Sequence, residues 1–217
     1  MTSDTFTFKS IFDAQRLPSL FTALILLALA YVAEHFANLY ELEYSLRPTS
    51  TYVGDLLLDN LPTYNVHFLI INVAVLTVAI GSAFILYRYP RYVLFSIKAI
   101  ALLIAIRAFF ISLTHVGIYP GVIPPDYGFF TNIYTYFNWQ VGFFFSGHTS
   151  IPFLMALIFW QNRRMRAIFL IMSALFGAAV LFAHIHYSID VFAAPFMAFG
   201  IFHIAKYLFP KDYELIR

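Results

Sequence analysis

The chain has 217 residues, of which 61% are hydrophobic and only 11% are charged. A soluble domain carries about 25% charged residues, so this composition excludes an ordinary soluble protein and favours one membrane-embedded domain over residues 1–217. The net charge of +2 argues against a nucleic-acid partner. Because the chain has no cysteine, it has neither disulfides nor a thiolate site. The first apolar run begins at Leu17, after a polar stretch, and we interpret it as a retained membrane anchor.

An all-α fold with six transmembrane helices is predicted, because a helix needs about 20 mostly apolar residues to cross a bilayer. The predicted spans are residues 17–37, 66–87, 92–113, 144–160, 167–184 and 189–209. With the N-terminus in the cytoplasm, only Arg47 and Arg107 among the 13 basic residues fall on the opposite side. We therefore expect both termini to be cytoplasmic.

Two longer outer loops are expected, at residues 40–65 and 114–142. The first is acidic, and its run of three leucines at 56–58 suggests a short helix on the membrane surface. The second leads into a Ser-Gly-His cluster, so we expect it to cover the site. Its aromatic rings can form a cage for a choline headgroup or an interfacial belt. On the inner side, Lys98 is expected to snorkel from the third span to the membrane surface.

Two polar clusters lie at opposite ends of a pair of apolar runs, which are joined by a basic turn at residues 161–166. If both runs cross the membrane, the clusters meet at its non-cytoplasmic face. In the second cluster, His186 and Asp190 are four residues apart and are expected on one face of a helix. The carboxylate can then orient the imidazole and leave its other nitrogen able to attack or to accept a proton. An incidental interfacial histidine is the alternative.

The first cluster, Ser146-Gly147-His148-Thr149, predicts the start of a helix. Ser and Thr side chains offer N-caps, and Gly147 lets a ligand approach the backbone. The N–H groups at a helix start attract phosphate. His148 is placed to protonate a leaving oxygen. The alternative is an ordinary capped helix that carries an incidental histidine.

Arg107 lies within the third span, where a charge is costly and marks either function or a buried partner. Its guanidinium can hold a phosphate through two parallel hydrogen bonds. Snorkelling, or a pair with Asp126 or with an acid of the first outer loop, is the alternative. His184 would point away from His186 on a continuous helix and is a candidate for supporting contacts. A zinc site built from the three histidines and Asp190 is a weaker hypothesis, because the phosphate-binding groups would then lack a purpose.

Together these groups predict phosphoryl transfer through a histidine, with no cofactor, metal or nucleotide. His186 attacks phosphorus, His148 protonates the departing alcohol, and a second alcohol or water accepts the phosphoryl group. Arg107 and the helix start hold the phosphate oxygens. A transporter or an inactive scaffold is a weaker hypothesis, because few polar groups lie near the middle of the spans.

The two motifs, Ser-Gly-His-Thr and His-x-His-Tyr-Ser-x-Asp-Val, resemble the sphingomyelin synthase branch of the type 2 phosphatidic acid phosphatase superfamily. The resemblance extends over the expected catalytic core, at about residues 92–209, and over the six-span layout. It implies a catalytic triad of His148, His186 and Asp190. The candidate substrate- or phosphate-binding residues are Arg107, Ser146, Gly147, Thr149, His184 and Tyr187.

The resemblance also implies transfer of a phosphocholine or phosphoethanolamine headgroup from a phospholipid to a lipid alcohol of the ceramide or diacylglycerol type. A lipid phosphate phosphatase, with water as acceptor, is the alternative. General phosphatases of the superfamily carry an arginine where this chain has Val180 and a proline where it has Phe145, and the lost arginine favours the transferase. The short chain is similar to bacterial members, which implies an inner (cytoplasmic) membrane with the site facing outward.

Overall fold

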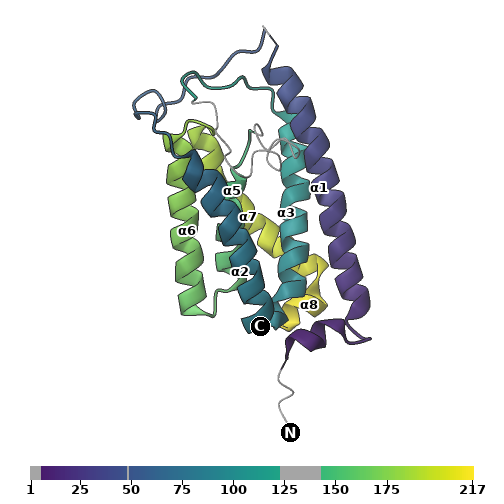
Figure 1. Ribbon diagram of the computed structural model, residues 1–217. Helices are drawn as coiled ribbons and strands as arrows, with labels where there is room; N and C mark the ends of the chain where they lie inside the picture. Colours follow the sequence, from purple (N-terminus) through teal and green to yellow (C-terminus); the bar gives the residue numbers. More distant parts are fainter. Residues whose placement is uncertain (1–5, 48, 123–142) are drawn as a thin grey trace.

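The computed structural model describes residues 6–47, 49–122 and 143–217, which form helices, turns and loops with no strand among them. The helices are η1 (Phe8–Phe12), α1 (Leu17–Ser45), η2 (Phe68–Val73), α2 (Ala74–Arg88), η3 (Pro90–Tyr92), α3 (Val93–Leu113), α5 (Gly147–Ile158), α6 (Arg163–Phe182), α7 (Ser188–Leu208) and α8 (Pro210–Glu214). Figure 1 shows a bundle with both termini at one end and the segments before α2 and after α3 at the other. The predicted all-α class is therefore confirmed for the described residues.

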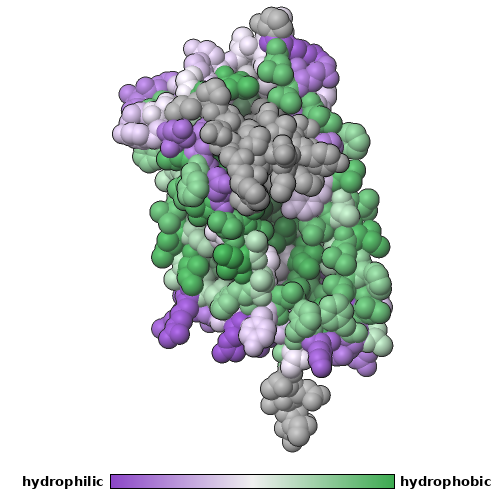
Figure 2. Space-filling view, viewed as in Figure 1, coloured by the Kyte–Doolittle hydropathy of each residue, from purple (hydrophilic) through white to green (hydrophobic). Residues whose placement is uncertain are grey.

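Five helical segments are long and apolar enough to cross a membrane: α1, η2 with α2, η3 with α3, α6 and α7. Large apolar side chains such as Phe21, Leu29 and Phe196 are exposed on the outside of the bundle. Figure 2 shows an apolar band between more hydrophilic ends. Because so much contiguous apolar surface needs a hydrocarbon surrounding, the chain is an integral membrane protein.

The fourth predicted span, residues 144–160, contains a helix of only 12 residues, α5. At about 1.5 Å per residue, α5 extends roughly 18 Å, which is less than the roughly 30 Å of hydrocarbon in a bilayer. Its N-cap, Ser146, is extended, and Phe159 already departs from helical geometry. The count of six crossings and the cytoplasmic placement of the termini remain predictions.

Close helix packing positions the two motifs. α1 lies along α3, and small residues, Ala30 and Ala101 among them, are buried between the two helices. α5 packs against both α6 and α7. Where they meet, a side-chain carbon on Gly177 of α6 would lie 3.2 Å from Thr149 Oγ1 and 3.1 Å from Val191 Cγ1. The absence of a side chain at this glycine therefore allows α6 to approach both motif-bearing helices.

The first outer loop differs from its prediction in two respects. α1 continues past residue 37 to Ser45, and Glu41 on this extension is fully buried within the bundle. The three-leucine run forms a hydrogen-bonded turn instead of a surface helix. Leu58 enters the core at 2% exposure while Leu56 remains 80% exposed, so the turn contributes one residue to packing.

The prediction that Lys98 snorkels is wrong. Lys98 is buried, and its Nζ lies 2.6 Å from Asp212 Oδ2 of α8 and 2.8 Å from Ser19 Oγ of α1. The Ser19 hydroxyl in turn donates to Asp212 Oδ1 at 2.7 Å. α8 brings a carboxylate to the lysine, so the charge is neutralised inside the protein and does not need to reach water.

Candidate active site

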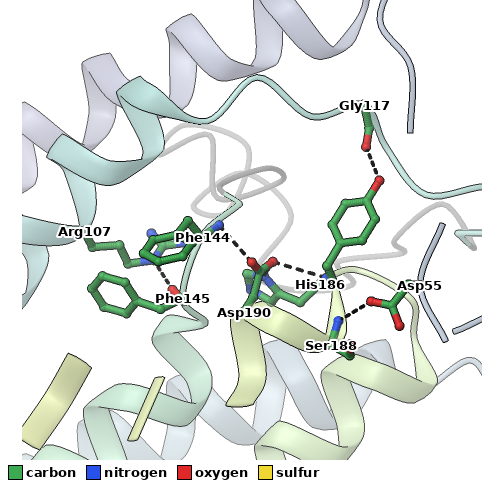
Figure 3. A network of polar contacts seen from close by, with 9 residues as sticks. Asp55, Arg107, Gly117, Phe144, Phe145, His186, Ser188 and Asp190 are labelled. Carbon is green, nitrogen blue, oxygen red and sulfur yellow. Dashed lines mark hydrogen bonds and ion pairs between the residues drawn. The ribbon is translucent and has the colours of Figure 1, made fainter. Parts of the chain in front are cut away.

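The carboxylate of Asp190 joins the two motifs. Its Oδ2 lies 3.1 Å from His186 Nδ1 and accepts a hydrogen bond from the Tyr187 N–H at 3.2 Å, while Oδ1 accepts from the Phe144 N–H at 3.1 Å. The backbone oxygen of Asp190 accepts from the Ser146 N–H at 2.9 Å. The structure therefore brings the Ser-Gly-His segment and the His-x-His segment side by side, at the end of the bundle opposite the termini (Figures 1 and 3).

The spacing of His186 and Asp190 predicted that they share one helix face, but in the structure they do not. α7 begins only at Ser188, and its N-cap, Tyr187, has an extended backbone (φ −65°, ψ 154°). The contact forms because Asp190, in the first turn of α7, accepts hydrogen bonds from the residues that precede the helix. Since Nδ1 faces this carboxylate, Nε2 of His186 is the ring nitrogen left for chemistry.

His148 lies in the first turn of α5, with Nε2 3.2 Å from the carbonyl oxygen of Ile70 in η2. His186 and Arg107 both lie within electrostatic range of its ring. Two histidines and an arginine from three parts of the chain thus share one site. The contact with Ile70 was not predicted, because every residue has a backbone carbonyl and the residue type therefore does not indicate such a contact.

Arg107 is buried and forms an ion pair with Glu34 of α1. Its Nε donates to the carbonyl oxygen of Phe145 at 3.1 Å, and a side-chain carbon on Gly147 would lie 3.8 Å from Nε. The guanidinium therefore lies beside the start of α5 (Figure 3). Asp126, the partner considered from the sequence, lies outside the described residues. Glu34 was missed, although a lone acid inside an apolar span is the same signal that marked Arg107.

The hydroxyls at the start of α5 are buried. Ser146 is the N-cap residue, but its side chain makes no capping hydrogen bond, contrary to the prediction. Within the described residues, Ser146 Oγ, Thr149 Oγ1 and Ser150 Oγ have no hydrogen-bond partner. Buried hydroxyls are normally paired, so this helix start offers donors that can hold the oxygens of an anion.

His184 lies where the chain turns between α6 and α7, with a left-handed backbone (φ 54°). Its Nδ1 lies 3.2 Å from Thr63 Oγ1 of the first outer loop, and the ring of Tyr119 packs edge-on at 5.4 Å. Its Nε2 is buried and has no partner among the described residues. Positive φ is uncommon for residues other than glycine, and such residues cluster at functional sites.

Tyr187 connects the second motif to two outer segments. Its hydroxyl donates to the carbonyl oxygen of Gly117 at 2.7 Å and accepts from the Val53 N–H at 3.3 Å. Burial raises the pKa of Tyr187, so the hydroxyl stays protonated and keeps its donor role. A side chain at Gly117 would lie 2.9 Å from the Thr51 carbonyl, so glycine permits this approach.

Asp55 of the first outer loop binds the N-terminus of α7, a contact that the sequence did not predict. Its Oδ2 accepts from the Ser188 N–H at 2.6 Å (Figure 3), and Oδ1 accepts from the N–H groups of Leu57 at 3.0 Å and Leu58 at 3.2 Å. Burial alone would raise the pKa of Asp55, but the hydrogen bonds from Ser188, Leu58 and Leu57 outweigh it and lower that pKa below its ordinary value. The loop carboxylate thus holds the helix that carries Asp190.

We expect Asp55→Asn to reduce the free energy of unfolding by about 1.5–3 kcal/mol, the contribution typical of hydrogen bonds to a charged group. Because the pKa is lowered in the folded protein, this stabilisation is complete above the unfolded pKa of about 4 and disappears as pH falls through the folded value. Denaturant unfolding in detergent, at about pH 7 and over a series of values that descends from about pH 4, measures the difference. Asp13→Asn, at an exposed position, is the control; equal effects of both substitutions at neutral pH would contradict the assignment.

The C-terminal part of the chain matches a known family. A family model described as PAP2 superfamily C-terminal covers residues 143–207, which include both motifs. This match supports membership of the type 2 phosphatidic acid phosphatase superfamily. No curated protein matches the chain.

Proposed function

We propose that this chain is an integral membrane enzyme that transfers a phosphoryl group or a phospho-headgroup between lipids through His186. The superfamily match supports a lipid phosphatase or phosphotransferase in general. The proposal depends on one observation: the Asp190 carboxylate contacts both His186 and the backbone that leads into the Ser-Gly-His segment. One acid thereby orients a nucleophile beside a candidate anion site.

The proposed reaction has two steps. Asp190 holds the Nδ1–H of His186, and Nε2 attacks phosphorus, so a P–N bond forms while the bond from phosphorus to the departing lipid oxygen breaks. His148 gives its proton to that oxygen. His148 then takes a proton from the incoming alcohol or water, whose oxygen attacks phosphorus and releases His186.

In this proposal the phosphate lies between Arg107 and the start of α5. The guanidinium and the hydroxyls of Ser146 and Thr149 stabilise the charge on its oxygens, together with the N–H groups at Gly147 and beyond. The ion pair with Glu34 and the bond to the Phe145 carbonyl fix the direction of the guanidinium.

His184 and Tyr187 act differently from one another in this scheme. The buried Nε2 of His184 is a candidate for contact with substrate. The Tyr187 hydroxyl is occupied by Gly117 and Val53, so we assign it the role of positioning the motif.

The preferred acceptor is a lipid alcohol of the ceramide or diacylglycerol type, with a phosphocholine or phosphoethanolamine lipid as donor, as in a sphingomyelin synthase-like transferase. A lipid phosphate phosphatase that uses water is the second candidate, and the superfamily match supports either activity in general. The site lies at the end of the bundle away from the termini (Figure 1). With the basic turn and the termini in the cytoplasm, it would face outward from a bacterial inner membrane.

Product analysis tests this function. Purified protein is incubated with labelled phosphatidylcholine, phosphatidylethanolamine or phosphatidic acid, each with and without ceramide or diacylglycerol. A new phospholipid that requires the added alcohol indicates the transferase, and water-soluble phosphate indicates the phosphatase. If no lipid is converted, under conditions in which the protein remains folded, the proposed function is wrong.

A further inference from the structure

One face of α1 carries polar side chains inside the bundle. Glu34, Asn38 and Glu41 stand at positions i, i+4 and i+7 and therefore share one helix face. Their exposed fractions are 7%, 1% and 0%. We call these three residues the α1 polar stripe. Polar groups within a spanning helix are costly, and those that persist serve a partner or a ligand.

Only part of the α1 polar stripe is satisfied by the protein. Glu34 pairs with Arg107, and Glu41 Oε1 accepts a hydrogen bond from Ser45 Oγ at 3.1 Å. Glu41 Oε2, Asn38 Oδ1 and Asn38 Nδ2 are buried and have no hydrogen-bond partner in the part of the chain that the structure describes. The stripe thus leaves two acceptors and one donor to be satisfied, and each unpaired buried group is costly.

The α1 polar stripe is continuous with the proposed phosphate site. Glu34 contacts Arg107, whose Nε binds the Phe145 carbonyl at the start of α5. Along the axis of α1, Glu41 lies about 10 Å from Glu34, at about 1.5 Å per residue. Asn38 and Glu41 therefore follow Glu34 on the same face of α1, by about one and two helical turns.

We infer that the α1 polar stripe binds the primary ammonium of a phosphoethanolamine-type headgroup, an inference that rests on the proposed function and names its substrate class. The ammonium donates to Glu41 Oε2 and Asn38 Oδ1, while Asn38 Nδ2 donates to a phosphate oxygen. A primary ammonium supplies a positive charge and three donors, which match a buried carboxylate and its neighbouring acceptor.

Other cations fit the α1 polar stripe less well. A quaternary ammonium donates no hydrogen bond, so both acceptors would remain unpaired beside it. Among the described residues, no group of three or more His, Cys, Asp or Glu side chains is arranged to hold a metal ion. Phosphatidic acid has no cationic headgroup and would leave the Glu41 carboxylate without a counter-charge.

Turnover by Glu41→Gln tests the inference, because this substitution keeps the shape of the side chain and removes its charge. We expect the ratio of phosphatidylethanolamine turnover to phosphatidic acid turnover to fall by about 10-fold or more, the change expected on losing a hydrogen bond to a charged group. Glu43→Gln, at an exposed position paired with Arg47, is the matched control and should keep the wild-type ratio. An unchanged ratio in Glu41→Gln would overturn the inference and leave the proposed function standing.

A binding measurement separates this inference from the proposed function. Phosphoethanolamine should raise the thermal unfolding midpoint of the wild-type protein in detergent more than phosphocholine does. Glu41→Gln should lose this difference, and Glu43→Gln should keep it. If the difference is present but no lipid is turned over, the proposed function fails and the inference survives. Equal stabilisation by the two compounds would refute the inference.

Discussion

His186→Ala is expected to lower lipid phosphoryl transfer by about 10⁴-fold or more, since removing a nucleophile that works as part of a triad eliminates most of the rate enhancement. The protein should remain folded, because the Tyr187 and Phe144 N–H groups still bind the Asp190 carboxylate. Initial rates with the lipid substrates measure the loss, and circular dichroism of the same preparation checks the fold.

His148→Ala is expected to cost about 10²–10⁴-fold, the range for a general acid. The two histidines differ in how they respond to the leaving group. With an aryl phosphate, whose leaving group needs no proton, the variant at His148 should recover much of its rate while His186→Ala stays inactive. His203→Ala, at an exposed position on α7, is the control and should behave as wild type. Full activity of either His148→Ala or His186→Ala on lipid substrates would contradict the proposed mechanism.

Lys98→Met should be the most damaging single substitution for stability outside the site. Among the described residues, it leaves the buried Asp212 carboxylate with the Ser19 hydroxyl as its one remaining side-chain partner. Breaking a buried ion pair in this way costs about 3–5 kcal/mol. Chemical unfolding of the purified protein in detergent, followed by circular dichroism, measures the change.

Two further variants show whether the loss comes from an uncompensated charge. The double variant Lys98→Met/Asp212→Asn should recover most of the stability, because neither buried charge remains. Lys211→Met removes a positive charge from the exposed neighbour of Asp212 and should have little effect. If the loss of unfolding free energy in the double variant equals the sum of the losses in the two single variants, the buried pair is not the cause of the instability.

The transmembrane helices were the most predictable part of the fold. The third span was expected at residues 92–113 and α3 runs from Val93 to Leu113; the last was expected at 189–209 and α7 runs from Ser188 to Leu208. In lipid every backbone polar group needs an internal partner, so a long apolar run must be helical. Apolarity does not show where a helix stops, and for this reason the shortness of α5 was not foreseen.

The chemical character of the candidate site was also visible in the sequence. His148, His186, Asp190 and Arg107 were selected from their types and spacing, and the structure brings them together. The detailed geometry was not visible. The His186–Asp190 contact was expected on a helix face, but it forms between a loop and a first helical turn, because Tyr187 begins α7 with an extended backbone.

The partners of the buried charges were the least predictable feature. Lys98 was expected to reach the membrane surface, Glu34 was overlooked, and Asp55 was counted only as part of an acidic loop. Each of these charges is paired with a group far away in the chain, at Asp212, Arg107 and the N-terminus of α7 respectively. A sequence contains no direct record of such pairs.

By itself, therefore, the sequence determined that this protein is a helical membrane protein and indicated the candidate side chains for phosphoryl chemistry. Only the tertiary structure decided which carboxylate meets which cation, and where α5 and α7 begin beside the histidines. The physical reason is the separation along the chain of the residues that interact. The hydrogen bonds of a helix join residues four apart, whereas an ion pair between helices depends on how segments a hundred residues apart pack together.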